Sequence, residues 1–227
     1  MSVLCVAAHP DDEVLGVGGT LARHADAGDD VYVCILSDGV TSRHDETDEA
    51  AREEIERRRN RARTACNKLG VKDTSFHTYP DNSFDTVPLL EIVQTIEAEI
   101  ERHEPEIIYT HHHGDLNVDH ELTSRATVTA SRPLADCTVN RVLEFETLSA
   151  TEWSTPTSSN AFQPTTFVDI ADHLKVKLDA LSVYEKELRE PPHPRTIETV
   201  RKNANVWGAK AGMEAAEPFE LLRKVQR

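Results

Sequence analysis

Two short segments of this chain concentrate side chains that can bind metal ions. Residues 9–13 read His-Pro-Asp-Asp-Glu and directly follow an apolar run at 3–8. Residues 111–120 contain three consecutive histidines and end in Asn-Val-Asp-His, and they follow a second apolar run at 107–110. Imidazole nitrogens and carboxylate oxygens are ligands of Zn²⁺ and related cations. We therefore predict that the two segments, far apart in the sequence, bind one divalent cation together.

The residue types in these segments fit a hydrolytic metal site. Such a site commonly has three nitrogen or oxygen ligands and a fourth position for water, whose pKa the cation lowers from about 15.7 towards about 7. His9, Asp12 and His120 supply a set of this kind. Asp11 is placed to take a proton as general base, and Asp119 is placed to fix the orientation of a ligand.

The sequence around these segments predicts strands joined by helices. Short continuous apolar runs alternate with amphipathic stretches, which is typical of a parallel sheet covered on both faces. We expect an α/β fold with a Rossmann-like, mostly parallel sheet and helices on both faces. The expected strands are 3–8, 31–36, 74–79, 107–110 and 142–145, and the expected helices are 14–27, 45–69, 89–100 and 121–130.

This fold class predicts where the metal-binding segments lie. Ligands of open parallel sheets bind outside the carboxyl ends of the strands. Four segments follow predicted strands directly: 9–13, 37–39, 80–82 and 111–120. We therefore expect them to line one crevice, which would be the active site.

The last third of the chain has a weaker pattern. A polar, Ser/Thr-rich connection at 147–164 is expected to lie over the site or between subunits. An edge strand at 167–168, a helix with an apolar stripe from Ile170 to Leu188, and a further helix from Thr196 are expected to follow. We predict a single domain over 1–227, in which 1–146 form the Rossmann-like core and 147–227 complete the site.

Composition excludes several classes of partner. The net charge of −15 argues against a general nucleic-acid or anionic-membrane binder, because phosphate-rich surfaces would repel it. The same acidic balance is compatible with a salt-loving host. The four cysteines are isolated, and no apolar stretch approaches the roughly 20 residues of a membrane span. We expect a cytoplasmic protein without stable membrane insertion.

At this point the motifs support a resemblance to a known family. The Ala-His-Pro-Asp-Asp-Glu run at 8–13 and the Asn-x-Asp-His run at 117–120 resemble the two metal motifs of the LmbE-like, or PIG-L-like, zinc-dependent N-acetylglucosaminyl deacetylases. The similarity extends over about 3–130 and includes the glycines at 16–19 and the Pro-Asp pair at 80–81. The segments 192–195 and 216–220 resemble a branch associated with surface polysaccharides.

The resemblance implies roles for individual residues. Zinc would be bound by His9, Asp12 and His120, with Asp11 as the base. Two further residues, Arg58 and Asp81, would contact the sugar or the group attached to it. The implied reaction is hydrolysis of an N-acetyl group from a small amino-sugar conjugate. Relatives also suggest a homo-oligomer, either a trimer or a hexamer.

The chain departs from the family pattern at Asn117, where many relatives have a histidine. An Asn amide can donate a hydrogen bond to an oxyanion, which contributes roughly 3 kcal/mol in the best case, but it cannot release a proton. Proton delivery to the leaving amine would then fall to Asp11 or to a histidine of 111–113. We favour Asp11 in both steps.

Other functions remain as alternatives. The same site could hydrolyse a non-sugar amide, or the chain could be a weakly active descendant that serves for binding or as a scaffold. A two-metal phosphoesterase would need more bridging carboxylates. A dinucleotide-binding module is disfavoured because the glycines at 16–19 lie after the acids and not at the strand–helix turn. The ligand set also suits Fe²⁺, Co²⁺ or Mn²⁺.

Overall fold

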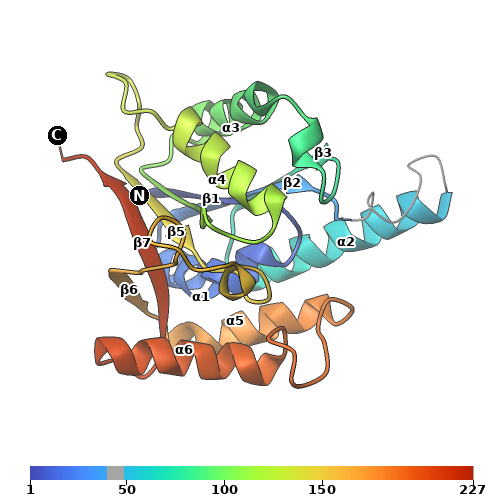
Figure 1. Ribbon diagram of the computed structural model, residues 1–227, viewed down its shortest axis with the longest axis vertical. Coiled ribbons are helices and arrows are strands. Elements are labelled where there is room, and N and C mark those ends of the chain that lie inside the picture. Colours follow the sequence, from blue (N-terminus) through green and yellow to red (C-terminus); the bar gives the residue numbers. More distant parts are fainter. Residues whose placement is uncertain (40–48, 227) are drawn as a thin grey trace.

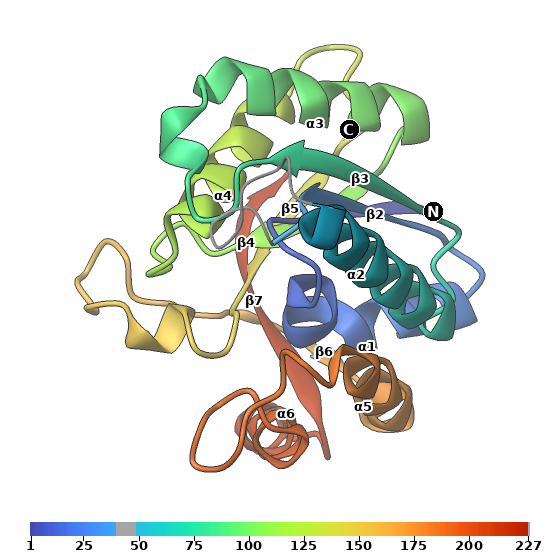
Figure 2. The same cartoon turned by 90° about the vertical axis from the view of Figure 1, so that its right-hand side faces the viewer.

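The computed structural model describes residues 1–39 and 49–226. One sheet has the strand order β3-β2-β1-β4-β5-β7-β6 (Figures 1 and 2). Strands β1 to β5 pair in parallel, whereas β7 pairs antiparallel with both β5 and β6. The mostly parallel α/β fold predicted from the sequence is thereby confirmed. The strands are β1 Ser2–Ala7, β2 Asp30–Ser37, β3 Asp73–Tyr79, β4 Ile107–His111, β5 Arg141–Phe145, β6 Thr166–Asp169 and β7 Ala216–Lys224.

Helices cover both faces of this sheet (Figure 1). On one face α3 and α4 pack over the strands, and on the other lie α1 and α2, with α5 and α6 outside α1. Alternate residues of β1 enter the two cores, Val3 and Cys5 on one side and Leu4 and Val6 on the other. Burial on both faces is the reason that this strand is a continuous apolar run. The helices are α1 Asp12–Asp26, α2 Glu49–Lys68, α3 Leu89–His103, α4 Val118–Ala130, α5 Leu174–Leu181 and α6 Ile197–Ala211.

Strand order explains why the two metal-binding segments meet. β1 is hydrogen-bonded to β2 on one side and to β4 on the other, so the direction of the connections reverses between β1 and β4. Ligand crevices of doubly wound sheets form at this switch point. Residues 9–13 leave the carboxyl end of β1 here, and 112–120 leave that of β4.

The structure differs from the sequence-based expectations mainly after residue 146. The expected helix up to Leu188 is shorter, because α5 ends at Leu181 and a 3₁₀ turn at Ser182–Tyr184 follows it. Strand β7 was not predicted, although it lies between β5 and β6. Helix α4 begins at Val118, three residues earlier than expected. The expected helix start at 45–48 lies outside the described residues.

A buried ion pair ties the late elements to the first helix. Lys177 of α5 donates from Nζ to Glu217 Oε1 of β7 at 2.6 Å and to the carbonyl of Leu15 at 2.9 Å. The Glu217 carboxylate in turn accepts from the backbone N–H groups of Gly19 and Thr20, at 2.9 and 2.7 Å. Both charged side chains are almost fully buried. The pair therefore engages α1, α5 and β7 together.

Within the described part of the chain, no helix has both the length and the apolar character that a membrane span requires.

Candidate metal centre and active site

The first metal-binding segment is held by an unusual backbone turn. Asp11 precedes helix α1 with φ of 112°, a left-handed conformation that a non-glycine residue adopts only when its surroundings enforce it. The buried Glu13 carboxylate accepts from Asp11 N–H at 3.0 Å and from the Tyr184 hydroxyl at 2.6 Å. Glu13 thus serves to fix Asp11, a role that the sequence alone did not indicate.

Three predicted ligands lie around a common point. One atom each of His9, Asp12 and His120 lies within 4.8 Å of the other two. Asp12 Oδ2 is 3.3 Å from His9 Nδ1 and 3.3 Å from His120 Nε2. The carboxylate of Asp12 therefore lies between the two imidazoles, one from the first metal-binding segment and one from the second.

The hydrogen bonds around this group leave a place for a cation. The carboxylate of Asp119 can only accept, so His9 must donate to it from Nε2, over 2.9 Å. In the neutral ring, Nδ1 then directs a lone pair at Asp12. Among the described residues, both ring nitrogens of the buried His120 and Oδ1 of Asp12 make no hydrogen bond. Buried polar atoms without hydrogen bonds are rare, and a metal ion bound by Asp12 would satisfy His120 Nε2, while Nδ1 of the same ring faces Asp115.

The same geometry shifts the acid–base equilibria of the group. Burial lowers the pKa of both imidazoles, but nearby carboxylates outweigh it and raise the pKa of His9 to about 10 and that of His120 to about 9. Burial also opposes ionisation of Asp12, yet the imidazoles of His120 and His111 hold the pKa of its carboxyl well below the ordinary value. The site thus stabilises positive charge beside an ionised Asp12. Either protons on the imidazoles or a bound cation can supply this charge.

Two further carboxylates orient the histidines. Asp119, fully buried, accepts from His9 and from the backbone N–H groups of Asn82 and Phe84 at 2.6 and 2.9 Å. Asp115 lies 3.3 Å from His120 Nδ1 and is itself fixed by the Thr151 hydroxyl at 2.6 Å. The role of Asp119 was predicted from the sequence and that of Asp115 was not, although both belong to the second metal-binding segment.

The three consecutive histidines have different surroundings. His111 Nε2 accepts from the backbone N–H of Ala8 at 2.9 Å, and its ring stacks on His120 with centroids 3.9 Å apart. Burial and then the neighbouring His120 lower the pKa of His111 to about 4, so this ring is a poor proton donor at neutral pH. His112 and His113 belong to another group of side chains, together with Glu144 of β5 and Glu220 of β7.

The predicted base lies beside an arginine. Asp11 Oδ2 accepts from Arg195 Nη1 at 3.0 Å. Burial raises the pKa of Asp11 to about 7, while the positive charge of Arg195 opposes the rise. A carboxyl with a pKa near neutrality is suited to both accepting and donating a proton. From the sequence, Arg195 was a weaker functional candidate than a simple helix break in the proline-rich segment.

A polar cleft of about 190 Å³ opens in front of these groups. Arg58 and Asp81, the predicted substrate contacts, both line it. Arg58 donates to the carbonyl oxygens of Asp38 and Gly39 and pairs with Glu187 at 2.7 Å. Asp81 Oδ1 lies 3.3 Å from His9 Nε2. The residues lining the cleft are His9, Pro10, Asp11, Asp12, Gly39, Arg58, Asp81, Asn82, Asn117, Glu187, Arg189 and Arg195.

Asn117 also lines the cleft, at the start of α4. Its side-chain oxygen accepts from the backbone N–H of Asp119 at 2.8 Å and so caps the helix. Its amide nitrogen donates to Asn82 Oδ1 at 3.2 Å. Six of the eight predicted site residues thus line one cleft, and the other two, His120 and Asp119, contact the lining residues Asp12 and His9. Their chemical roles stay predictions.

Known proteins resemble this chain in sequence and in fold. Diacetylchitobiose deacetylase of Thermococcus kodakarensis is 26% identical over 97% of this chain and 82% of that protein. The structure of N,N'-diacetylchitobiose deacetylase from Pyrococcus horikoshii aligns with a TM-score of 0.77 and 21% identity, covering 98% of this chain and 84% of the other. The 4-carboxy-2-hydroxymuconate hydratase of Pseudomonas putida KT2440 aligns with a TM-score of 0.74 and 21% identity, over 100% and 98%. The fold is therefore shared by enzymes with different reactions.

The family assignment rests on sequence. Residues 4–131 match the model of the family described as PIG-L: GlcNAc-PI de-N-acetylase. This range covers more than half of the chain and contains both metal-binding segments together with Arg58 and Asp81. The resemblance inferred from the two motifs is confirmed, and the chain belongs to the PIG-L family.

Proposed function

We propose that this protein is a metal-dependent hydrolase that removes the N-acetyl group from an N-acetylglucosamine-type amino sugar. The observation that carries the proposal is the convergence of His9, Asp12 and His120, with unpaired buried polar atoms, next to Asp11 at the floor of an open cleft. We prefer deacetylation to the hydration carried out by the Pseudomonas putida enzyme, which resembles this chain in fold. The relatives found by sequence, such as the diacetylchitobiose deacetylase, are named as deacetylases.

The residues of the chain have separate tasks in this reaction. A zinc ion, or Fe²⁺, Co²⁺ or Mn²⁺ in its place, held by the His-Asp-His set would act as Lewis acid towards the acetyl carbonyl and a water molecule. Asp11 accepts the proton of the attacking water and returns it to the leaving nitrogen, so that acetate and a free amine are formed. Asn117 is placed to donate to the developing oxyanion. Asp119 and Asp115 keep the imidazoles in place.

The cleft is suited to a polar, small-molecule substrate. Its lining contains three arginines and several carboxylates but few apolar side chains. Arg58 and Asp81 would bind hydroxyl groups of the sugar or of its attached group.

The proposal is tested with N-acetylated sugars, free and conjugated, by measuring release of primary amine and of acetate. The protein is stripped with a chelator and reloaded with single divalent metals. We expect activity to disappear on stripping and to return with zinc or another transition metal. Asp11→Asn, which removes the base, should lower kcat by about 10²–10⁴-fold, as general bases typically contribute.

Asp85→Asn is the matched control, because Asp85 is an exposed acid on the 3₁₀ turn at Phe84–Thr86 near the cleft but does not line it. Its rate should equal that of the unmodified protein. Amine release from non-sugar amides alone would favour the general amidase. Full activity after complete removal of metal, or an Asp11→Asn variant of undiminished rate, would contradict the mechanism.

A further inference from the structure

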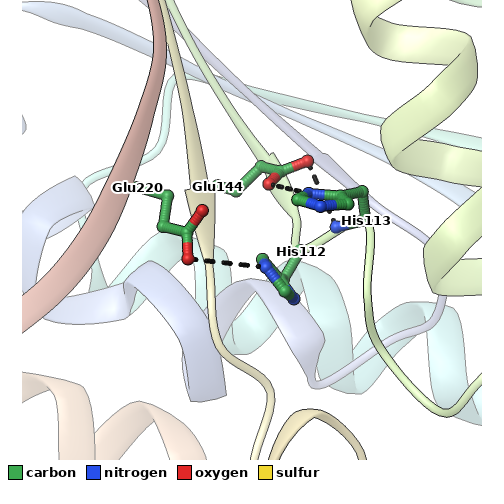
Figure 3. Close-up of side chains that lie close together, drawn as sticks. All are labelled: His112, His113, Glu144 and Glu220. Carbon is green, nitrogen blue, oxygen red and sulfur yellow. Dashed lines mark hydrogen bonds and ion pairs between the residues drawn. The ribbon is translucent and has the colours of Figure 1, made fainter. Parts of the chain in front are cut away.

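A second group of metal-binding side chains lies on the sheet beside the cleft. His112 and His113 follow β4, Glu144 lies in β5, and Glu220 lies in β7 (Figure 3). One ligand atom from each of the four lies within 4.8 Å of all the others. None of these residues belongs to the His-Asp-His set or lines the cleft.

The four side chains point towards one another. His112 Nε2 lies 3.5 Å from Glu220 Oε1, and His113 Nδ1 lies 2.8 Å from Glu144 Oε2 (Figure 3). His112 is completely buried, yet its Nε2 makes no hydrogen bond within the described residues. A buried nitrogen directed into a group of carboxylates without a partner is a position that a cation would satisfy.

Two carboxylates in this group are direct neighbours. Glu144 and Glu220 occupy opposite positions in the antiparallel β5–β7 pair. Like charges opposite each other destabilise a sheet, and Glu144 is also fully buried, where an unpaired charge is very unfavourable. Positive charge close to both carboxylates, or a proton on one of them, would relieve this repulsion.

Hydrogen bonds around the group hold the ligands in place. His113 donates from Nε2 to the carbonyl of Ser159 at 3.0 Å, so in the neutral ring Nδ1 has its lone pair directed at Glu144. Glu144 Oε1 accepts from the hydroxyl of Ser124 at 2.5 Å. A histidine that donates to a carbonyl from its other nitrogen is the usual support of a metal ligand.

A proton on His113 is the simplest competing source of positive charge. It would satisfy the contact with Glu144, but it would leave Nε2 of His112 without a hydrogen bond, 3.5 Å from Glu220 Oε1. A cation would engage all four side chains at once. His112 would then give up the long 3.2 Å hydrogen bond that its Nδ1 accepts from Gly114 N–H.

We propose that His112, His113, Glu144 and Glu220 bind a structural divalent cation of the zinc type. Four protein ligands close a tetrahedral site, in contrast to the three-ligand set at the cleft, which leaves a position for substrate. Zinc–nitrogen bonds of about 2.0–2.1 Å give ligand-to-ligand distances of about 3.4 Å. Two pairs lie at 3.5 and 2.8 Å, and the others lie within 4.8 Å and would have to move closer. His113 is partly exposed, which gives the ion a route from solvent.

The ion would fix a long connection to the sheet. Between the 3₁₀ turn at Thr151–Trp153 and β6, the Ser159 carbonyl accepts from His113, Phe162 contacts the ring of His112 at 5.2 Å, and the backbone N–H of Gln163 donates to Glu220. Each of these three contacts is made to a proposed ligand. Binding of the ion would therefore order both the connection and the start of the second metal-binding segment.

The test counts metal ions in the full-length protein without using activity. Stripped protein is reloaded with excess zinc, desalted and analysed by mass spectrometry of the metal. We expect two zinc ions per chain in the unmodified protein and one in His9→Gln, which lacks a cleft ligand. Glu220→Gln should also lose one ion, and the combined variant should lose both. In His9→Gln, hydrogen exchange across 154–165 should slow on zinc addition, and cobalt should give the visible absorption of a tetrahedral site.

Glu214→Gln is the matched control, because Glu214 is an exposed acid just before β7 and its substitution removes the same charge as Glu220→Gln. It should retain two ions. Glu220 is at the rim of the group, so its variant should fold, as circular dichroism would verify, even if a change at the buried His112 does not. A folded His9→Gln protein without zinc would overturn the proposal, and so would Glu220→Gln protein that keeps both ions. Neither result depends on whether the protein deacetylates a sugar.

Discussion

At the scale of single residues, the contact between Asp11 and Arg195 controls the proposed base. Asp11 is almost fully buried, and its left-handed backbone directs the carboxylate towards the cleft, where Arg195 donates to it. The arginine stabilises the ionised carboxylate, whereas burial favours the protonated form. The protonation of Asp11 thus depends on a residue from a distant, proline-rich segment.

We predict that Arg195→Met shifts the acidic limb of the kcat/KM profile to higher pH. The base acts only when ionised, so the rate rises as pH increases through the pKa of Asp11. Loss of the guanidinium removes an influence that lowers this pKa, and the rise must then occur at higher pH. The measurement is kcat/KM for amine release against pH.

Arg189→Gln serves as the comparison, because Arg189 lines the same cleft but donates to the carbonyls of Lys186 and Leu188. Its acidic limb should coincide with that of the unmodified protein. An equal shift in both variants would mean that general charge in the cleft, and not the contact with Asp11, sets the profile.

The proposed metal ligands could be predicted from the sequence more fully than the residues that hold them in place. His9, Asp12 and His120 are recognisable because ligand types follow directly on two predicted strands. Asp115, Glu13 and Arg195 act through contacts that depend on side-chain direction, which residue spacing does not specify. Asn117 has two roles in the structure, because its side chain caps α4 and also lines the cleft.

At the scale of secondary-structure elements, the Lys177–Glu217 pair connects α1, α5 and β7. The parallel strands were predictable because burial on both faces requires continuous apolar runs. Strand β7 was missed because Glu217, Pro218 and Glu220 interrupt that pattern. The two glutamates face side chains of other elements in the structure. Glu217 pairs with Lys177, and Glu220 lies 3.5 Å from His112. Residues that serve such partners obscure the local signal of a strand.

We predict that Lys177→Met lowers the free energy of unfolding by about 3–5 kcal/mol, since removing one member of a buried pair leaves the other charge uncompensated. Urea unfolding followed by circular dichroism measures the change. Lys175→Met is the matched control on the same helix, because Lys175 is highly exposed and pairs with Asp179 at the surface. Its unfolding midpoint should be almost unchanged. Equal midpoints for both variants would show that the buried pair is not important for stability.

At the scale of the whole molecule, the excess of acidic residues determines the response to salt. The net charge of −15 is carried by 227 residues, so like charges repel one another across the folded surface. The Lys177–Glu217 ion pair is shielded from solvent and is less affected by screening.

We predict that the thermal unfolding midpoint rises when the salt concentration increases from about 0.05 M to about 1 M, where the screening length falls to about 3 Å. Differential scanning fluorimetry in sodium chloride measures it. An equal osmolarity of a neutral solute controls for effects unrelated to charge. A midpoint that falls with salt, or that rises equally with the neutral solute, would contradict the role of surface repulsion.

The attachment of Glu217 to helix α1 has a consequence for the order in which the protein is made. Its partners Gly19 and Thr20 leave the ribosome early, whereas Glu217 is 198 residues behind Gly19. Lys177 leaves the ribosome before Glu217, which carries the opposite charge. The core can close around Lys177 only after β7 has been synthesised, so products that stop short of β7 would expose an incomplete interior to proteases and chaperones.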